Sequence, residues 1–323
     1  INHTTCMDVM DSANKNLFEP LGIKDAYWEP LGKAVQGFSG LRLTTRDIAR
    51  FGYLMVNGGQ WDGKQIISSQ FVKDALAPLT ATPFPGSTYG YMWWTSENND
   101  YAMALGYGGQ YIMVVPNKDL VVVLTGGYHD LVRLAVHVYP FIVKALGLKT
   151  EDKALPVNSE GTTQLQALVE ELANPKASPI KELPATASAI SGLPYSMVLS
   201  MVFQPRANVG STVSMKALQL DFNGTDTFTL NLTSATDQVV TVTVGLDGLY
   251  RVSDFLTWQV AAKGEWLTPN DLRIYLKYVG DGLVERVDLN FGTGSVVGTM
   301  YQMTGALGFV SDTTSFAAVA VPE

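Results

Sequence analysis

The sequence predicts an α+β domain, in which helices pack on an antiparallel sheet, followed by an all-β, up-and-down barrel-like domain. Three observations support this fold class. At 323 residues the chain is longer than one ordinary domain. Helical and strand patterns mix over its first half, whereas only short alternating strands recur in its second half. We expect a first domain over residues 1–150, a linker over 151–195, a barrel over 196–310 and a loose tail over 311–323.

Composition limits the classes of partner. Apolar residues make up 46% of the chain, enough for a large buried core, and the formal net charge is -8. Nucleic acids and anionic membrane surfaces attract clustered Lys and Arg, so we expect neither as a partner. No run approaches the roughly 18 unbroken apolar residues of a membrane span. The single cysteine, Cys6, excludes an internal disulfide and leaves the compartment open.

Two helices of the first domain have clear start signals. Thr44 precedes Asp47 by three residues, a capping-box spacing, and Gly58-Gly59 ends the run that follows. The apolar positions between these signals recur at helical spacing; they are Ile48, Phe51, Leu54 and Met55. Ser68 or Ser69 caps a second predicted helix. A third helical pattern extends over residues 129–146.

Strand patterns separate these helices. Residues 89–95 (YGYMWWT) are aromatic-rich and predict one strand. Residues 111–115 and 120–125 are apolar runs on either side of residues 116–119 (PNKD), which predicts an antiparallel hairpin with a tight turn. The paired glycines Gly108-Gly109 directly precede this hairpin. Such glycines often mark a place where another backbone or a ligand approaches closely.

The second half of the chain changes character. Prolines at positions 156, 175, 179, 184 and 194 indicate a linker, with a short helix over residues 163–172. Strands of alternating polarity then follow at intervals of roughly ten residues, separated by Gly, Asn and Asp turns. The expected strands are residues 218–222, 228–232, 240–244, 250–253, 258–263, 272–278, 284–291 and 296–303. Short sequential connections favour an up-and-down barrel over a sandwich.

Four short stretches occur in a fixed order in the first domain. They are residues 17–23 (LFEPLGI), 40–52 (GLRLTTRDIARFG), 89–91 (YGY) and 106–110 (GYGGQ). In order and spacing they resemble the C-terminal half of the penicillin-recognising serine hydrolases, which include class C-type β-lactamases, esterases, peptidases and nylon-oligomer hydrolases. The resemblance implies a partial β-lactamase/transpeptidase-like domain. The trailing barrel, of lipocalin-like type, is similar to domains appended to such hydrolases.

The resemblance implies roles for the fourth stretch. The family's third signature, a Lys-Thr-Gly or His-x-Gly type triplet on the strand that lines the active site, corresponds to Tyr107-Gly108-Gly109. The backbone N–H of Gln110 is then an oxyanion donor, worth on the order of 3 kcal/mol in the transition state, with Tyr111 as the alternative. Tyr107 stands where the family has Lys or His, which favours a neutral ester or amide over a β-lactam carboxylate.

We also expect Tyr89, Trp93 and Tyr111 to line a site for a small-molecule or peptide substrate. Trp93 and Trp94 alternate on a predicted strand, so one faces the core and the other faces the cleft or solvent. Core packing is the alternative role for Trp93. Asp47 lies beside two arginines, and we interpret it as a helix-capping acid rather than a catalytic carboxylate.

The family's nucleophile is missing from this pattern. Its members need Ser-x-x-Lys at the start of a buried helix, and a Tyr-x-Asn signature that this sequence lacks. Ser-x-x-Lys occurs at residues 12–15, which we interpret as a solvated helix face, and at 178–181, in the linker with a proline in its putative first turn. The resemblance therefore implies that the nucleophile lies on a preceding N-terminal part of the hydrolase domain. We expect this segment alone to be inactive, with an exposed apolar patch or a partner segment where that part packs.

Two other functions are compatible with the sequence. One is a non-catalytic pseudo-hydrolase, or binding protein, whose barrel holds a cell-wall or lipid-like ligand. In the other, the barrel is a lid that restricts substrate size. The three histidines, His3, His129 and His137, have no carboxylate at ligand spacing, so we expect no metal and no cofactor. A periplasmic or secreted location is the habit of the family that the first domain resembles.

Overall fold

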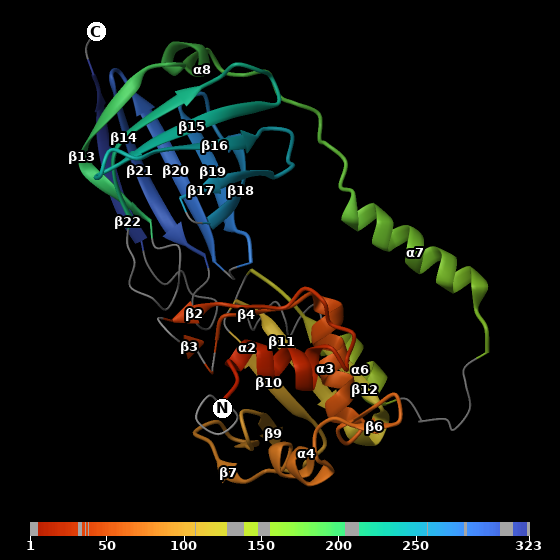
Figure 1. Cartoon of the computed structure of the whole chain (residues 1–323). Coiled ribbons are helices and arrows are strands. Elements are labelled where there is room, and N and C mark those ends of the chain that lie inside the picture. Colours follow the sequence, from red (N-terminus) through yellow and green to blue (C-terminus); the bar gives the residue numbers. More distant parts are fainter. Residues whose placement is uncertain are drawn as a thin grey trace. The chain divides into compact units, whose positions relative to one another are not determined.

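The computed structural model describes residues 6–31, 34–35, 37, 39–106, 108–127, 139–147, 156–203, 213–256, 258–280, 283–303 and 313–321. The chain divides into two compact units (Figure 1). The first comprises residues 1–126 and 133–152, and the second comprises residues 127–132 and 153–323. Each unit is described below by itself.

The first unit contains a six-stranded sheet with the strand order β12-β11-β10-β9-β8-β7, in which neighbouring strands are antiparallel. The strands are β7 (Thr80–Ala81), β8 (Ser87–Tyr89), β9 (Trp94–Ser96), β10 (Ala102–Gly106), β11 (Gln110–Val115) and β12 (Leu120–Leu124). The predicted hairpin is confirmed as β11 and β12. Its turn is a short 3-10 helix, Pro116–Lys118, followed by Asp119 in the left-handed conformation (φ 50°).

Helices cover this sheet on both faces. They are α2 (Val9–Ala13), which continues into a π-helix (Asn14–Phe18), α3 (Thr45–Val56), α4 (Ser69–Ala75) and α6 (Tyr139–Leu146). Side chains of Met55, Val72 and Val114 share one core cluster, which joins α3 and α4 to the sheet. On the opposite face Met113 packs with Ile142 of α6. The predicted arrangement of helices on an antiparallel sheet is confirmed.

Both predicted helix starts are confirmed. The side chain of Thr44 accepts a hydrogen bond from Asp47 N at 3.2 Å, and that of Ser68 accepts one from Phe71 N at 3.2 Å. Three two-stranded pairs complete the unit. They are β1 (Tyr27–Trp28) with β4 (Leu41–Arg42), β2 (Pro30–Leu31) with β3 (Ala34–Val35), and β5 (Gln60–Trp61) with β6 (Lys64–Gln65).

The prediction of a single strand over residues 89–95 is wrong. The segment belongs to two short strands, β8 and β9, which pair with each other through Tyr89 and Trp94. Met92 between them has a positive φ of 65°. A Cβ atom on Gly90 would lie 2.1 Å from the carbonyl oxygen of Ala75, so the chain turns tightly against α4 at this point. The aromatic composition of the segment conceals this turn.

The second unit is a ten-stranded antiparallel sheet with the strand order β16-β15-β14-β13-β22-β21-β20-β19-β18-β17. The strands are β13 (Pro194–Phe203), β14 (Val213–Asp221), β15 (Thr227–Ser234), β16 (Val239–Gly245), β17 (Arg251–Phe255), β18 (Trp258–Trp266), β19 (Asp271–Tyr278), β20 (Val284–Gly292), β21 (Ser295–Gln302) and β22 (Thr313–Ala320). β13 and β22, the first and last barrel strands along the chain, pair with each other. β16 and β18 meet at one parallel bridge, so the sheet closes on itself. The predicted up-and-down barrel is confirmed.

The expected loose tail over residues 311–323 is wrong. It contains β22, which lies between β13 and β21; residues 313–319 pair with β21, and residues 317–320 pair with β13. Phe316 and Ala318 of this strand are buried in the barrel core. The expected linker also contains structure, because α7 (Ser159–Ala173) and α8 (Ala185–Ile190) lie within it. The short helix expected over residues 163–172 is present in α7, whose side chains are almost all exposed.

The interior of the barrel is filled by its own side chains. One buried apolar cluster takes in residues from every barrel strand. Aromatic rings meet inside it, with Phe203 5.3 Å from Phe255 and Phe255 6.1 Å from Tyr278, measured between ring centroids. The Tyr278 hydroxyl donates a hydrogen bond to the buried carboxylate of Glu285 at 2.9 Å. The barrel described here is therefore a packed core.

Candidate functional site

The paired glycines form the turn between β10 and β11. Gly106 and Gln110 are the last cross-strand pair of this hairpin, and φ is 73° at Gly108 and 88° at Gly109. Residues with a Cβ atom are strained in this left-handed region, which explains the requirement for glycine at both positions. Tyr107, the first residue of the expected signature triplet, lies outside the described residues.

The backbone that approaches this turn belongs to the same chain. A Cβ atom on Gly126 would lie 3.0 Å from the carbonyl oxygen of Gly108. The side-chain amide of Gln110 donates to the carbonyl oxygen of Gly126, and to that of Gly108 at 3.4 Å. The turn and the segment that follows β12 are thus held together by glycine contacts and by one amide side chain.

The strand that begins at Gln110 is internal to the sheet. It pairs with β10 on one side, and from Tyr111 onward it pairs with β12 on the other. Tyr111 is only 5% exposed, and its burial raises the pKa of the phenol above its ordinary value. From Tyr111 onward, β11 is paired on both sides, so an extended substrate cannot pair with this part of the strand.

Strand β10 has an open edge along part of the side that faces β9. Strand β9 pairs with β10 only at Ala102 and Met103. Among the described residues no strand pairs with Ala104, Leu105 or Gly106 on that side. An unpaired strand edge offers backbone N–H and C=O groups to an extended ligand. Sequence reasoning did not identify this segment, because strand pairing is set by distant residues; Gly106 was the only local signal.

The aromatic residues of the segment 89–95, which were predicted to line the site, are divided between the core and the surface. Trp93 is 5% exposed and belongs to the core that joins the sheet to α3 and α4. Tyr89 and Phe84 instead pack against Trp94, with ring centroids 5.1 Å and 5.7 Å away. Trp94 pairs with Met103, so its side chain is on the same face of the sheet as that of Leu105, two residues further along. Tyr89 and Trp94 thus stand beside the open edge, whereas Trp93 is a core residue.

Large apolar side chains are exposed in this part of the first unit. Met92 is 63% exposed, Phe84 60% and Leu105 41%. Each belongs to the strands around the open edge or to their connections. Exposed apolar groups of this size are typical of a surface that another segment or a ligand covers.

The carboxylate of Asp47 has a structural role. Asp47 is 6% exposed, accepts a hydrogen bond from the Thr44 hydroxyl at 2.6 Å and pairs with the Arg50 guanidinium at 2.5 Å. Arg50 also donates to the carbonyl oxygen of Gly22 at 3.1 Å. These contacts account for the interpretation of Asp47 as a capping acid.

Neither Ser-x-x-Lys sequence forms a catalytic pair. Ser12 is in α2, but the following residues form a π-helix, and Lys15 is exposed. The Ser12 hydroxyl accepts from the Asn16 amide at 3.4 Å. Ser178 lies in an extended segment rather than at the start of a helix, and its backbone N–H donates to Asp247 O at 2.7 Å. An activated serine needs a base within hydrogen-bonding reach, which neither site provides.

Metal and membrane features complete the description. Within the described ranges, His, Cys, Asp and Glu side chains nowhere gather in a group of three or more that could hold a metal ion. His3, His129 and His137 lie outside those ranges. The described helices include none that combines the length and the apolar character needed to cross a bilayer.

Comparison with known proteins finds partial similarities. No family model matches the chain. A putative β-lactamase from Bacteroides dorei is similar to 36% of this chain over 43% of its own, with 17% identity and a TM-score of 0.29.

The resemblance extends to one particular kind of hydrolase. Over 101 residues, 28% of this chain, the sequence is 30% identical to 6-aminohexanoate-dimer hydrolase of Paenarthrobacter ureafaciens. The chain spans only 26% of the length of that curated relative. A putative 6-aminohexanoate-dimer hydrolase from Bacillus anthracis is 26% identical, with a TM-score of 0.39, over 46% of this chain and 41% of that one.

Proposed function

We propose that this chain is the C-terminal part of a serine hydrolase with a β-lactamase-like fold, which cleaves a neutral ester or amide through an acyl-enzyme. The observation that carries the proposal is the open edge of β10 beside the glycine turn. The sequence similarity to a named amide hydrolase agrees with it. The nucleophilic serine and its lysine belong, in this proposal, to polypeptide that precedes residue 1, so the present segment alone is inactive.

The edge of β10 defines what this segment contributes to catalysis. The acyl part of the substrate lies extended against Ala104, Leu105 and Gly106, and Tyr89 and Trp94 border it. A backbone N–H at this edge stabilises the oxyanion together with the N–H of the nucleophile. Gln110 was the donor expected from the sequence; it remains a candidate because it pairs directly with Gly106 at the end of the ladder. No cofactor takes part in this proposal.

The nucleophile acts on the bound carbonyl group in two steps. Its hydroxyl proton passes to the neighbouring base as the serine oxygen bonds to the carbonyl carbon, and the alcohol or amine leaves with a proton. Water then attacks the acyl-enzyme and releases the acid.

The exposed apolar side chains Phe84, Met92 and Leu105 support docking of a preceding segment onto this side of the unit.

Substrate class is tested on the complete protein with chromogenic compounds. We expect hydrolysis of p-nitrophenyl butyrate and of butyryl p-nitroanilide, and little hydrolysis of the β-lactam nitrocefin. Preferential hydrolysis of nitrocefin would contradict the assignment of a neutral substrate. Absence of turnover with all three would favour the second candidate, a non-catalytic binding protein.

That second candidate is favoured by one observation, the absence of a catalytic Ser-x-x-Lys pair in the described residues. A role of the barrel as a lid is a further proposal. Deletion of residues 195–323 from the complete protein then broadens the range of acyl chain lengths hydrolysed, whereas unchanged selectivity would contradict it. A periplasmic or secreted location remains a proposal based on the family resemblance.

A further inference from the structure

A segment of the linker crosses the outer wall of the barrel. We call residues 178–184 the strap. At its start Ser178 N donates to the carbonyl oxygen of Asp247, in the turn between β16 and β17. At its end the strap leads into α8, where Ala187 and Ile190 are buried. Pro179 and Pro184 lack an N–H group and so cannot join a strand ladder, which keeps the strap separate from the wall beneath it.

A groove of about 700 Å³ lies between the strap and the barrel wall. Its floor comes from β18 and β19, and its far side comes from the turn between β16 and β17. On β18, Val260 and Ala262 are buried in the core, so Lys263 and Glu265, which alternate with them, face outward into the groove. Its volume is in the range that encloses a small organic ligand.

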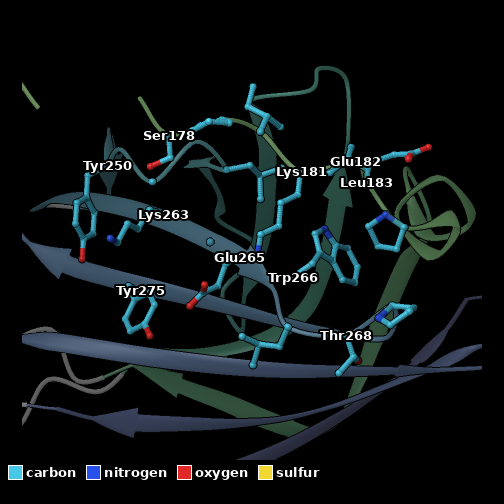
Figure 2. A pocket seen from close by; sticks show the side chains of 18 residues that line it. Ser178, Lys181, Glu182, Leu183, Tyr250, Lys263, Glu265, Trp266, Thr268 and Tyr275 are labelled. Atoms are coloured by element: carbon cyan, nitrogen blue, oxygen red, sulfur yellow. The ribbon is translucent and has the colours of Figure 1, made fainter. Parts of the chain in front are cut away.

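One end of the groove carries an ammonium group and phenol rings. Lys263 Nζ lies 5.0 Å from the ring centroid of Tyr250 and 5.9 Å from that of Tyr275; Figure 2 shows the three side chains. Lys277 does not line the groove, but its Nζ lies 4.5 Å from the centroid of the same Tyr250 ring. Within the described part of the chain, neither lysine forms an ion pair with a carboxylate.

This end of the groove is arranged to receive negative charge. Burial, and secondarily the charge of Lys263, lowers the pKa of Lys277, which indicates like charges in partly desolvated surroundings. Burial, and secondarily Tyr275, raises the pKa of the Tyr250 phenol above its ordinary value. A bound anion relieves the repulsion between the two ammonium groups and accepts hydrogen bonds from the phenols.

The other end of the groove is apolar and contains one unused donor. Trp266 packs against Phe222 and Phe291, with ring centroids 5.9 Å and 6.0 Å away. Its indole N–H is buried and has no hydrogen-bond acceptor. Figure 2 shows Leu183 of the strap near Trp266, and Ile180 and Pro184 also line the groove. The groove thus joins a cationic head region to an apolar region with a spare donor.

One acidic side chain lies in the middle of the groove. Figure 2 shows Glu265 between Lys263 and Trp266, with Lys181 extending toward it from the strap, whereas the carboxylate of Glu182 points away from Glu265. Glu265 disfavours an anion in the middle, whereas Lys263 favours one at the Tyr250 end. The acidic head of a bound ligand is therefore expected at the Tyr250 end.

We propose that this groove binds an anionic amphiphile, with its acidic head beside Lys263, Tyr250 and Tyr275 and its apolar body under the strap against Trp266. This inference is independent of the proposed hydrolase activity, because every residue in it belongs to the second unit. A carboxylate and a phosphate monoester share the required head chemistry. The experiment distinguishes them.

Binding is measured by isothermal titration calorimetry on the full chain at neutral pH. The probes are decanoate and decyl phosphate, with decanol and decyltrimethylammonium as neutral and cationic controls of equal chain length. We expect at least one anionic probe to bind at least tenfold more tightly than either control. The tighter of the two anions identifies the head group. Equal affinities for decanoate, decyl phosphate and decanol would overturn the proposal.

Variants test the residues that the proposal names. Lys263→Gln should weaken binding of the preferred anion at least tenfold, since a charge-assisted contact is lost. Lys263→Arg, which keeps the charge, should retain binding within about threefold. The matched control is Lys216→Gln, because Lys216 is on β14, outside the groove, and pairs with Asp237. Equal affinity of Lys263→Gln and Lys216→Gln proteins would also overturn the proposal.

Discussion

Arg50 donates a hydrogen bond to the carbonyl oxygen of Gly22 at 3.1 Å, across 28 residues of sequence. The contact joins two of the four stretches that carry the resemblance to serine hydrolases. Leu21, from the first of these stretches, and Leu54, two residues beyond the second, are 1% and 0% exposed in one core cluster. The residues of these two stretches that are described here therefore maintain the fold, and the proposed catalytic groups lie in other parts of the protein.

The ion pair of Arg50 with Asp47 should contribute to the stability of α3. Arg50→Ala leaves a buried carboxylate with the Thr44 hydroxyl as its remaining side-chain partner. Because the Arg50 side chain is 41% exposed, solvent offsets part of the loss, and we expect about 2 kcal/mol. Amide exchange of α3, followed by mass spectrometry, should accelerate roughly 30-fold. Arg46→Ala, an exposed change on the same helix, is the control; equal effects of the two changes would contradict this role.

The glycine turn should tolerate no side chain at its second position. Gly109→Ala places a Cβ atom on a residue with φ 88°, at a cost of about 1–2 kcal/mol. The expected result is faster amide exchange in β10 and β11. Gly37→Ala is the control, because a Cβ atom there meets nothing within 4 Å. Unchanged exchange in the Gly109→Ala protein would show that the turn is not held in this conformation.

The turn that anchors the strap should respond to acid. The hydrogen bond from Arg251 to Asp247, 2.8 Å long, is the largest cause that holds the pKa of Asp247 below its ordinary value of 3.8. A depressed pKa in the folded state contributes stability above the ordinary pKa, and this contribution is lost as pH falls through the folded value. Asp247→Asn should therefore lower the melting temperature of the second unit at pH 7. The difference from the unmodified protein should shrink below about pH 4; a difference that is constant with pH would contradict the linkage.

The last strand should be essential for the barrel. A chain that ends at residue 303 lacks β22 and leaves β13 and β21 without their shared partner. It also loses Phe316, which is 2% exposed and contacts the position of Gly298. We expect no cooperative thermal unfolding transition for this barrel by circular dichroism. Removal of residues 322–323 alone is the control and should leave the transition unchanged.

Local patterns in the sequence predicted most strands of the barrel but not the two that close it. β15 alternates throughout between buried and partly exposed residues, and β14 from Leu218 and β16 up to Val244 also alternate, so their period of two is visible. β13 has register shifts against both neighbours, which break that period. β22 is made largely of Thr, Ser and Ala, whose alternation is weak.

Only those features of the candidate site that depend on local sequence were predictable. The glycine pair marked the correct turn, because a positive φ is a local requirement. The free edge of β10 was not predictable, since it depends on where β9 stops pairing. Trp93, expected at the site surface, is 5% exposed and lies in the core, since the expected continuous strand is in fact a tight turn between β8 and β9.

The central claim is that β10 supplies one side of a serine hydrolase site whose nucleophile precedes this chain. The most direct measurement is treatment of the complete protein with a fluorophosphonate, followed by peptide mass spectrometry. The account predicts a single adduct, on the serine of a Ser-x-x-Lys sequence upstream of residue 1, and none on the present chain expressed alone. An adduct on Ser12 or Ser178, or no adduct on the complete protein, would contradict it.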